Sequence, residues 1–112
     1  METKSGIGVA KSMKPMLKSL ATKFFLTDDA AFMACVSLAI AKELELSDTG
    51  PVERTWHIGG SRKELIEYVA WHFQTDDPVT KFEQLGHAGL RYVSEQLEKN
   101  LPFETIFSPA TD

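Results

Sequence analysis

This chain of 112 residues has a single cysteine, Cys35, and no long apolar run. One cysteine excludes an intrachain disulfide and any metal site built from several thiolates, and it fits a reducing compartment. The longest apolar stretch, residues 30–41, is shorter than the about 18 residues of a membrane-spanning helix. The first residues also lack the apolar block and cleavage signal of a secretory peptide. We therefore expect a cytoplasmic protein with no membrane segment.

The composition is that of one ordinary globular domain, with 43% hydrophobic and 25% charged residues. The net charge of −4 is unevenly distributed, because residues 1–23 hold five lysines against one glutamate and carry +4, whereas the remaining 89 residues carry −8. This predicts a flexible basic arm over residues 1–12 and a single helical domain over 13–112. The arm could contact nucleic acid or serve solubility alone, and the acidic body argues against DNA binding over the whole surface.

Hydrophobic periodicity predicts a mainly α protein, a compact bundle of about four helices. Start signals precede three of them: Thr27 followed by two aspartates, a capping box from Ser61 to Glu64, and an acidic cap before Pro78. The predicted helices cover residues 15–25, 27–41, 62–73 and 78–99, with a short extended segment at 56–58.

The segment 30–41 is apolar nearly all round, which is typical of a helix surrounded by neighbours, so we expect it at the centre of the fold. Gly86 and Gly89 lie on the apolar stripe of the last helix. Glycine costs about 1 kcal/mol relative to alanine in a helix. We therefore expect a neighbouring ring or backbone to press against these glycines.

Residues capable of catalysis are scattered along the chain. The three histidines fall on three different predicted elements, and His72 and His87 are most simply interpreted as half-buried packing residues. Cys35 lies in the most apolar helix, where burial would make its thiol inert. The aspartate pairs 28–29 and 76–77 are explained as helix caps. We predict no catalytic residue, no metal site and no cofactor, and hence a protein that is not an enzyme.

The best candidate site is the segment 54–63, because it gathers cations, two glycines and a helix start. Glycines before a helix can present backbone amides to an anion, and an exposed tryptophan offers a flat face to a base or to a partner's side chain. Phosphate contact, protein contact and a purely structural turn all remain open. The candidate residues are Arg54, Trp56, His57, Gly59, Gly60, Ser61, Arg62 and Lys63.

Several segments carry a family resemblance: Phe-Phe-Leu (24–26), Thr-Asp-Asp-Ala-Ala-Phe-Met-Ala (27–34), Thr-Trp-His-Ile-Gly-Gly (55–60) and Phe-Glu-Gln-Leu-Gly-His-Ala-Gly-Leu (82–90). With them the chain resembles, over about residues 24–99, the small helical proteins encoded beside Dnd-type DNA-phosphorothioation and related phage-defence genes. The resemblance implies a non-enzymatic component that acts on or near DNA within a larger assembly. It supplies no active-site residues to transfer.

The expected function is that of a non-catalytic small subunit or adaptor in a prokaryotic phage-defence or DNA-modification complex. It would bind larger protein subunits through Trp56 and the apolar tail residues Phe103, Ile106 and Phe107, unless that tail packs back on the body. The alternative is a nucleic-acid-binding module that contacts DNA or RNA phosphates through residues 54–63 and the N-terminal lysines. A small enzyme with an unfamiliar site is a third possibility, and the sequence also allows a homo-oligomer.

Overall fold

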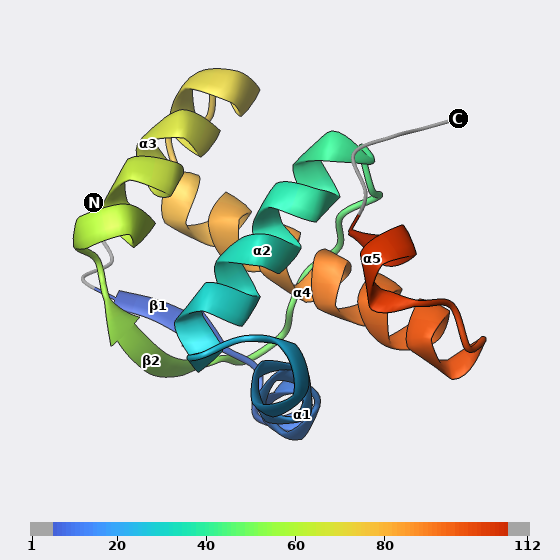
Figure 1. Ribbon diagram of the computed structural model, residues 1–112. Helices are drawn as coiled ribbons and strands as arrows, with labels where there is room; N and C mark the ends of the chain where they lie inside the picture. Colours follow the sequence, from blue (N-terminus) through green and yellow to red (C-terminus); the bar gives the residue numbers. More distant parts are fainter. Residues whose placement is uncertain (1–5, 108–112) are drawn as a thin grey trace.

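Five helices, a 3-10 turn and two short strands form the part of the chain, residues 6–107, that this computed structural model describes (Figure 1). In chain order they are β1 (Gly6–Val9), the turn η1 (Lys11–Met13), α1 (Lys14–Phe24), α2 (Asp28–Ala41), β2 (Glu53–His57), α3 (Gly60–Phe73), α4 (Pro78–Glu98) and α5 (Phe103–Ile106). The mainly helical class is confirmed. A plain four-helix bundle is not, because a fifth helix and a two-stranded sheet take part in the fold.

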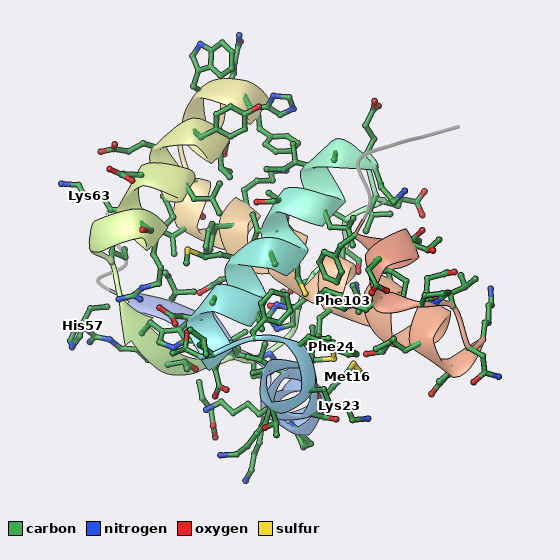
Figure 2. The ribbon with its side chains drawn as sticks, viewed as in Figure 1. Met16, Lys23, Phe24, His57, Lys63 and Phe103 are labelled. Carbon is green, nitrogen blue, oxygen red and sulfur yellow. The ribbon has the colours of Figure 1, made fainter. Side chains whose placement is uncertain are left out.

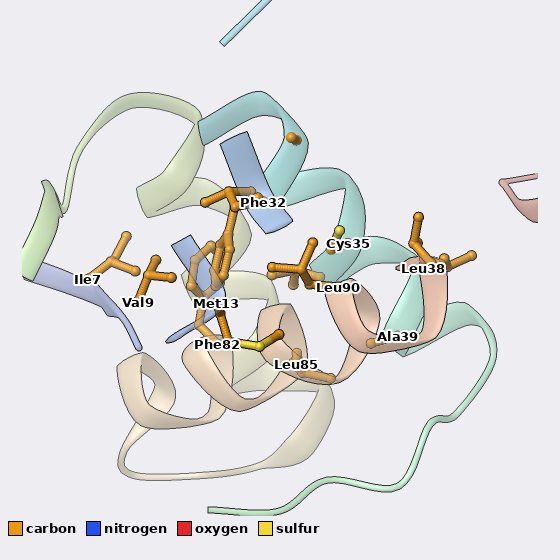
Figure 3. Packing of buried hydrophobic residues seen from close by; sticks show 14 of the residues in the cluster. Ile7, Val9, Met13, Phe32, Cys35, Leu38, Ala39, Phe82, Leu85 and Leu90 are labelled. Atoms are coloured by element: carbon orange, nitrogen blue, oxygen red, sulfur yellow. The ribbon is translucent and has the colours of Figure 1, made fainter. Parts of the chain in front are cut away.

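The centre of the fold is the contact between α2 and α4, the most extensive contact between two elements (Figure 1). Phe32 and Cys35 of α2 are fully buried, and Figure 3 shows them in one core with Phe82 and the strand residue Val9. This confirms the central position expected for the apolar segment 30–41. The burial is the main source of stability here, because a fully buried apolar side chain contributes about 1.5–3 kcal/mol.

The two glycines of α4 allow the helices to approach this closely. A Cβ atom on Gly86 would run into the ring of Phe32, and one on Gly89 would run into the backbone carbonyl of Cys35. The expected ring and backbone neighbours are therefore both present. The unfavourable helix propensity of glycine is offset by the packing that its missing side chain permits.

The strands form an antiparallel pair in which Ile7 lies opposite Trp56 and Val9 opposite Glu53, with an irregularity between Ile7 and Gly8. Ile7 and Val9 are fully buried. The expectation of a flexible arm is therefore wrong for residues 6–12, while residues 1–5 lie outside the described part. The extended segment also begins earlier than predicted, at residue 53 instead of 56, because its length is set by pairing with a distant strand.

The helix starts follow the sequence signals in two cases out of three. The Thr27 hydroxyl accepts a hydrogen bond from the Ala30 amide at 3.3 Å, and the Asp77 carboxylate accepts one from the Thr80 amide at 3.3 Å. The capping box at Ser61 is wrong, because α3 begins two residues earlier than predicted and has Gly59 as its cap, with no side-chain hydrogen bond. Gly60 has φ of +57°, a left-handed conformation that favours glycine.

Helix α1 packs against α2, and its residues Leu17, Leu20 and Ala21 are buried in the core. Within the described residues no single helix is long and apolar enough to span a membrane. The segment Lys11–Phe24 and helix α2 meet that test of length and composition only as a pair, and they are bent by 99° at the break between them.

Replacing Gly89 with alanine tests the close approach of α2 and α4. In an exposed helix this change would stabilise by about 1 kcal/mol. Here we expect the free energy of unfolding to fall by about 1–3 kcal/mol, because the new methyl group meets the Cys35 carbonyl. Chemical denaturation measures the difference. In the control Gly59→Ala the Cβ meets no atom within 4 Å, and a loss for Gly89→Ala no larger than in this control would contradict the packing account.

Candidate functional site

The segment 54–63 forms the outer strand β2 and the first turn of α3. His57 and Lys63 are exposed and point away from the body (Figure 2). An Arg54 guanidinium nitrogen lies 3.1 Å from Nδ1 of His57. Gly59 and Gly60 connect the strand to the helix, and Ser61 is exposed in the first turn. Of the cations predicted for this site, Arg54 and His57 therefore lie side by side.

Arg62 ties the start of α3 to the start of α2. Its Nε donates to the His57 carbonyl at 2.9 Å, and its Nη1 donates to the Asp29 carboxylate in a salt bridge whose side chains are only 23% and 25% exposed. Hydrogen bonding from the Thr27 hydroxyl, followed by the charge of Arg62, lowers the pKa of Asp29. The expectation that Arg62 supplies mobile charge for an anion is wrong, because its guanidinium already serves a carboxylate.

Trp56 faces the interior. Its ring centroid lies 5.3 Å from that of the buried Phe32, and the side chain is half-buried. Successive side chains of a strand point to opposite faces, and Trp56 lies opposite the buried Ile7 on the inward face. The tryptophan predicted to offer a flat exposed face is therefore largely a core residue.

The apolar tail packs back on the body. Ile106 is buried, and Phe103 stacks on Phe24 with ring centroids 4.2 Å apart, a pair visible in Figure 2. Phe107 contacts the Phe25 ring at 5.9 Å. Of the two readings that the sequence left open, packing on the body is correct, so most of the surface of the three predicted partner-contact residues is already covered.

Glu83 and His87 are buried on α4 and hold strand β1. The Gly8 amide donates to a Glu83 carboxylate oxygen at 2.7 Å, and the Ala10 amide donates to Nε2 of His87 at 3.0 Å. Nε2 is thus an acceptor, which assigns the proton to Nδ1, where it is donated to the Glu83 carbonyl at 2.6 Å. Burial lowers the pKa of His87. His87 is more buried than expected, and the role of Glu83 could not be seen from the sequence.

Cys35 is a core residue, as predicted. Burial raises the pKa of its thiol to about 12, so the reactive thiolate is essentially absent at neutral pH. Within residues 6–107 no group of three His, Cys, Asp or Glu side chains is arranged to hold a metal ion.

The largest exposed aromatic side chain lies at the end of α3. Trp71 is 72% exposed and Tyr68 is 43% exposed, and the Tyr68 ring stacks on the exposed His72 at 5.5 Å. We call these three residues the α3 aromatic surface. The prediction of a half-buried His72 is wrong, because the apolar stripe that includes Ile66 and Val69 turns the opposite side of α3 to the core.

An apolar cleft of about 470 Å³ adjoins this surface. It lies where the C-terminal ends of α2 and α3 stand above α4 (Figure 1), and His72 belongs to both the cleft and the α3 aromatic surface. Two of its lining residues are polar or charged, Glu43 and His72. The lining residues are Ala39, Ile40, Glu43, Leu44, Leu46, His72, Phe73 and Leu85.

The sequence contains a signal for this surface. Tyr68 and Trp71 are large aromatic residues placed off the apolar stripe of their helix, where a polar residue is the usual choice. No protein-family model, curated protein or solved structure matches this chain. The choice of a candidate site therefore depends on the geometry and chemistry of the residues themselves.

Protonation of His87 should lower the free energy of unfolding in mild acid. The folded state favours the neutral imidazole, so the unfolded chain binds more protons once the pH falls below the ordinary pKa of 6.5. We expect the free energy of unfolding to decrease between pH 7.5 and 5.5. His87→Gln should cost about 1–3 kcal/mol at pH 7.5, because buried hydrogen bonds are lost, and should flatten this dependence. Denaturation at several pH values measures both effects.

The exposed His72 provides the matched control, since His72→Gln should keep the pH dependence of the natural protein. An unchanged pH dependence in His87→Gln would show that another group is responsible.

Proposed function

We propose that this protein is a non-catalytic subunit or adaptor that binds a larger protein through the α3 aromatic surface and the adjoining cleft. The observation that carries the proposal is the 72% exposure of Trp71 beside an apolar cleft. Exposed tryptophan and tyrosine are enriched among the residues that dominate binding energy at protein interfaces. The site differs from the one expected from the sequence, whereas the class of function is the same.

Removal of apolar surface from water would drive this binding. An exposed indole keeps a large apolar area in contact with solvent, and a partner that covers it gains about 25 cal/mol for each Å² removed from water. The stacked ring of Tyr68 supports one side of the surface, and the cleft supplies a second apolar area. The surface belongs to a regular helix, so its backbone needs little rearrangement, which reduces the entropic cost of binding.

The proposed setting is a phage-defence or DNA-modification complex in a prokaryotic cytoplasm. This setting is supported by the resemblance to proteins encoded beside Dnd-type genes and by no contact within the structure. Its partners would be larger subunits of such a complex, and the subunit would itself perform no chemistry.

A second candidate function is contact with nucleic-acid phosphates at the start of α3. The outward position of Lys63 and His57, next to a helix start without a side-chain cap, favours it. The Asp29 carboxylate, bound to Arg62 in the same turn, opposes it. This function would require duplex affinity that falls steeply between about 50 and 200 mM salt and that drops in Lys63→Ala.

Trp71→Ala tests the proposed adaptor function. We expect the variant to lose the partner that co-purifies with the natural protein from its host, because truncation of a central aromatic anchor costs about 2 kcal/mol or more of binding energy. Its thermal stability should change little, since the side chain is mostly exposed. Mass spectrometry of the purified complexes identifies and quantifies the partner.

Leu26→Ala is the control, because Leu26 is a fully exposed apolar residue that precedes α2, at the opposite end from the cleft. Equal retention of the partner by Trp71→Ala and by Leu26→Ala would contradict the proposed function.

A further inference from the structure

Negative charge surrounds the cleft and the α3 aromatic surface. Glu43 lines the cleft, Glu67 lies one turn before Trp71 on α3, and Asp76 and Asp77 follow the end of that helix; Glu67 and both aspartates are exposed. Lys81 is a nearby cation, and its ammonium lies 5.5 Å from the centre of the Phe73 ring. Lys42, next to Glu43, is a second cation, and its ammonium lies 6.0 Å from the centre of the Tyr92 ring. The acidic groups therefore outnumber the two lysines at this end of the molecule.

The partial charges at the ends of α2 and α3 also make this region more negative. The cleft lies between the C-terminal ends of α2 and α3, which finish at Ala41 and Phe73. The C-terminus of a helix carries about half a negative charge from its aligned peptide dipoles. The start of α4 at Pro78 carries the opposite partial charge, and the Asp77 carboxylate caps it. The two C-terminal ends beside Glu43 therefore favour a cation, and the face of the Trp71 indole can attract the charge of lysine or arginine.

From this arrangement we infer that the partner contributes a basic amphipathic helix, whose apolar residues enter the cleft and whose lysine or arginine side chains meet Glu43 in the cleft and Trp71 beside His72. The inference depends on the proposed function, because it names the chemistry of the partner at the same surface. Apolar residues spaced i, i+3, i+4 and i+7 extend over about 10 Å of a helix. The cleft volume of about 470 Å³ falls within the range of established binding sites, about 300–1,000 Å³.

The apolar lining determines the kind of side chain that enters. Ile40, Leu44, Leu46 and Phe73 present aliphatic and aromatic surface, so leucine, isoleucine or methionine of the partner would find apolar contacts there. Basic side chains at the edge keep their charged ends in water while their carbon chains cover apolar surface. A helix with apolar and basic faces satisfies both requirements.

The test uses two synthetic helical peptides, one of leucine and lysine and one in which glutamate replaces each lysine. Fluorescence anisotropy of the labelled peptides measures their affinity for the full-length protein. We expect the basic peptide to bind at concentrations at which the acidic peptide does not. Trp71→Ala and Glu43→Lys should each weaken the basic peptide about fivefold or more.

Glu98→Lys is the matched control, because it makes the same charge change at the other end of α4 and should leave affinity nearly unchanged. An equal loss in Glu98→Lys and Glu43→Lys would overturn the inference, since net charge alone would then explain binding. Equal binding of the acidic peptide would also overturn it.

A second copy of this chain could also occupy the cleft, and analytical ultracentrifugation tests for it by measuring self-association. Self-association that Trp71→Ala abolishes would overturn the inference in favour of that copy. The inference and the proposed function can fail separately. If a host partner requires Trp71 but the basic peptide does not bind, the inference fails and the adaptor function stands. If no partner requires Trp71, both fail.

Discussion

The close contact of α2 with α4 at Gly86 and Gly89 determines the rest of the structure. Because neither glycine has a side chain, the ring of Phe32 and the backbone at Cys35 lie directly against α4. This contact fixes the position of α2, against which α1, strand β2 and the first turn of α3 then pack. It also brings the C-terminal ends of α2 and α3 to one side of α4, where they form the walls of the cleft.

Several ionisable side chains that could take part in catalysis or binding instead form hydrogen bonds that hold the fold together. Arg62 joins two helix starts, Glu83 accepts a hydrogen bond from the Gly8 amide of β1, and His87 accepts one from the Ala10 amide that follows this strand. Each of these groups would be costly to bury without its partner, so each is held in place. These polar groups are thus structural, whereas Trp71 at the end of α3 is the most exposed of the aromatic side chains in residues 6–107.

Most of the helical framework could be predicted because its signals are local. The caps at Thr27 and Asp77 and the periodic apolar positions place most helix ends within about two residues of those observed. Strand β1 could not be predicted, because Gly-Ile-Gly-Val has no helical periodicity and is held by residues 53–57 and by Glu83, far away in the chain. The exposure of Trp71, by contrast, does have a local signal, because this residue lies off the apolar stripe of α3 that contains Ile66 and Val69.

The most direct measurement for this account is a nuclear Overhauser experiment on the natural protein in solution. The account predicts cross-peaks between the ring protons of Phe32 and the α protons of Gly86, and between the α protons of Gly89 and Cys35, because these atoms are in van der Waals contact. Absence of both sets of cross-peaks from a fully assigned spectrum would contradict the α2–α4 contact and the arrangement of elements that depends on it.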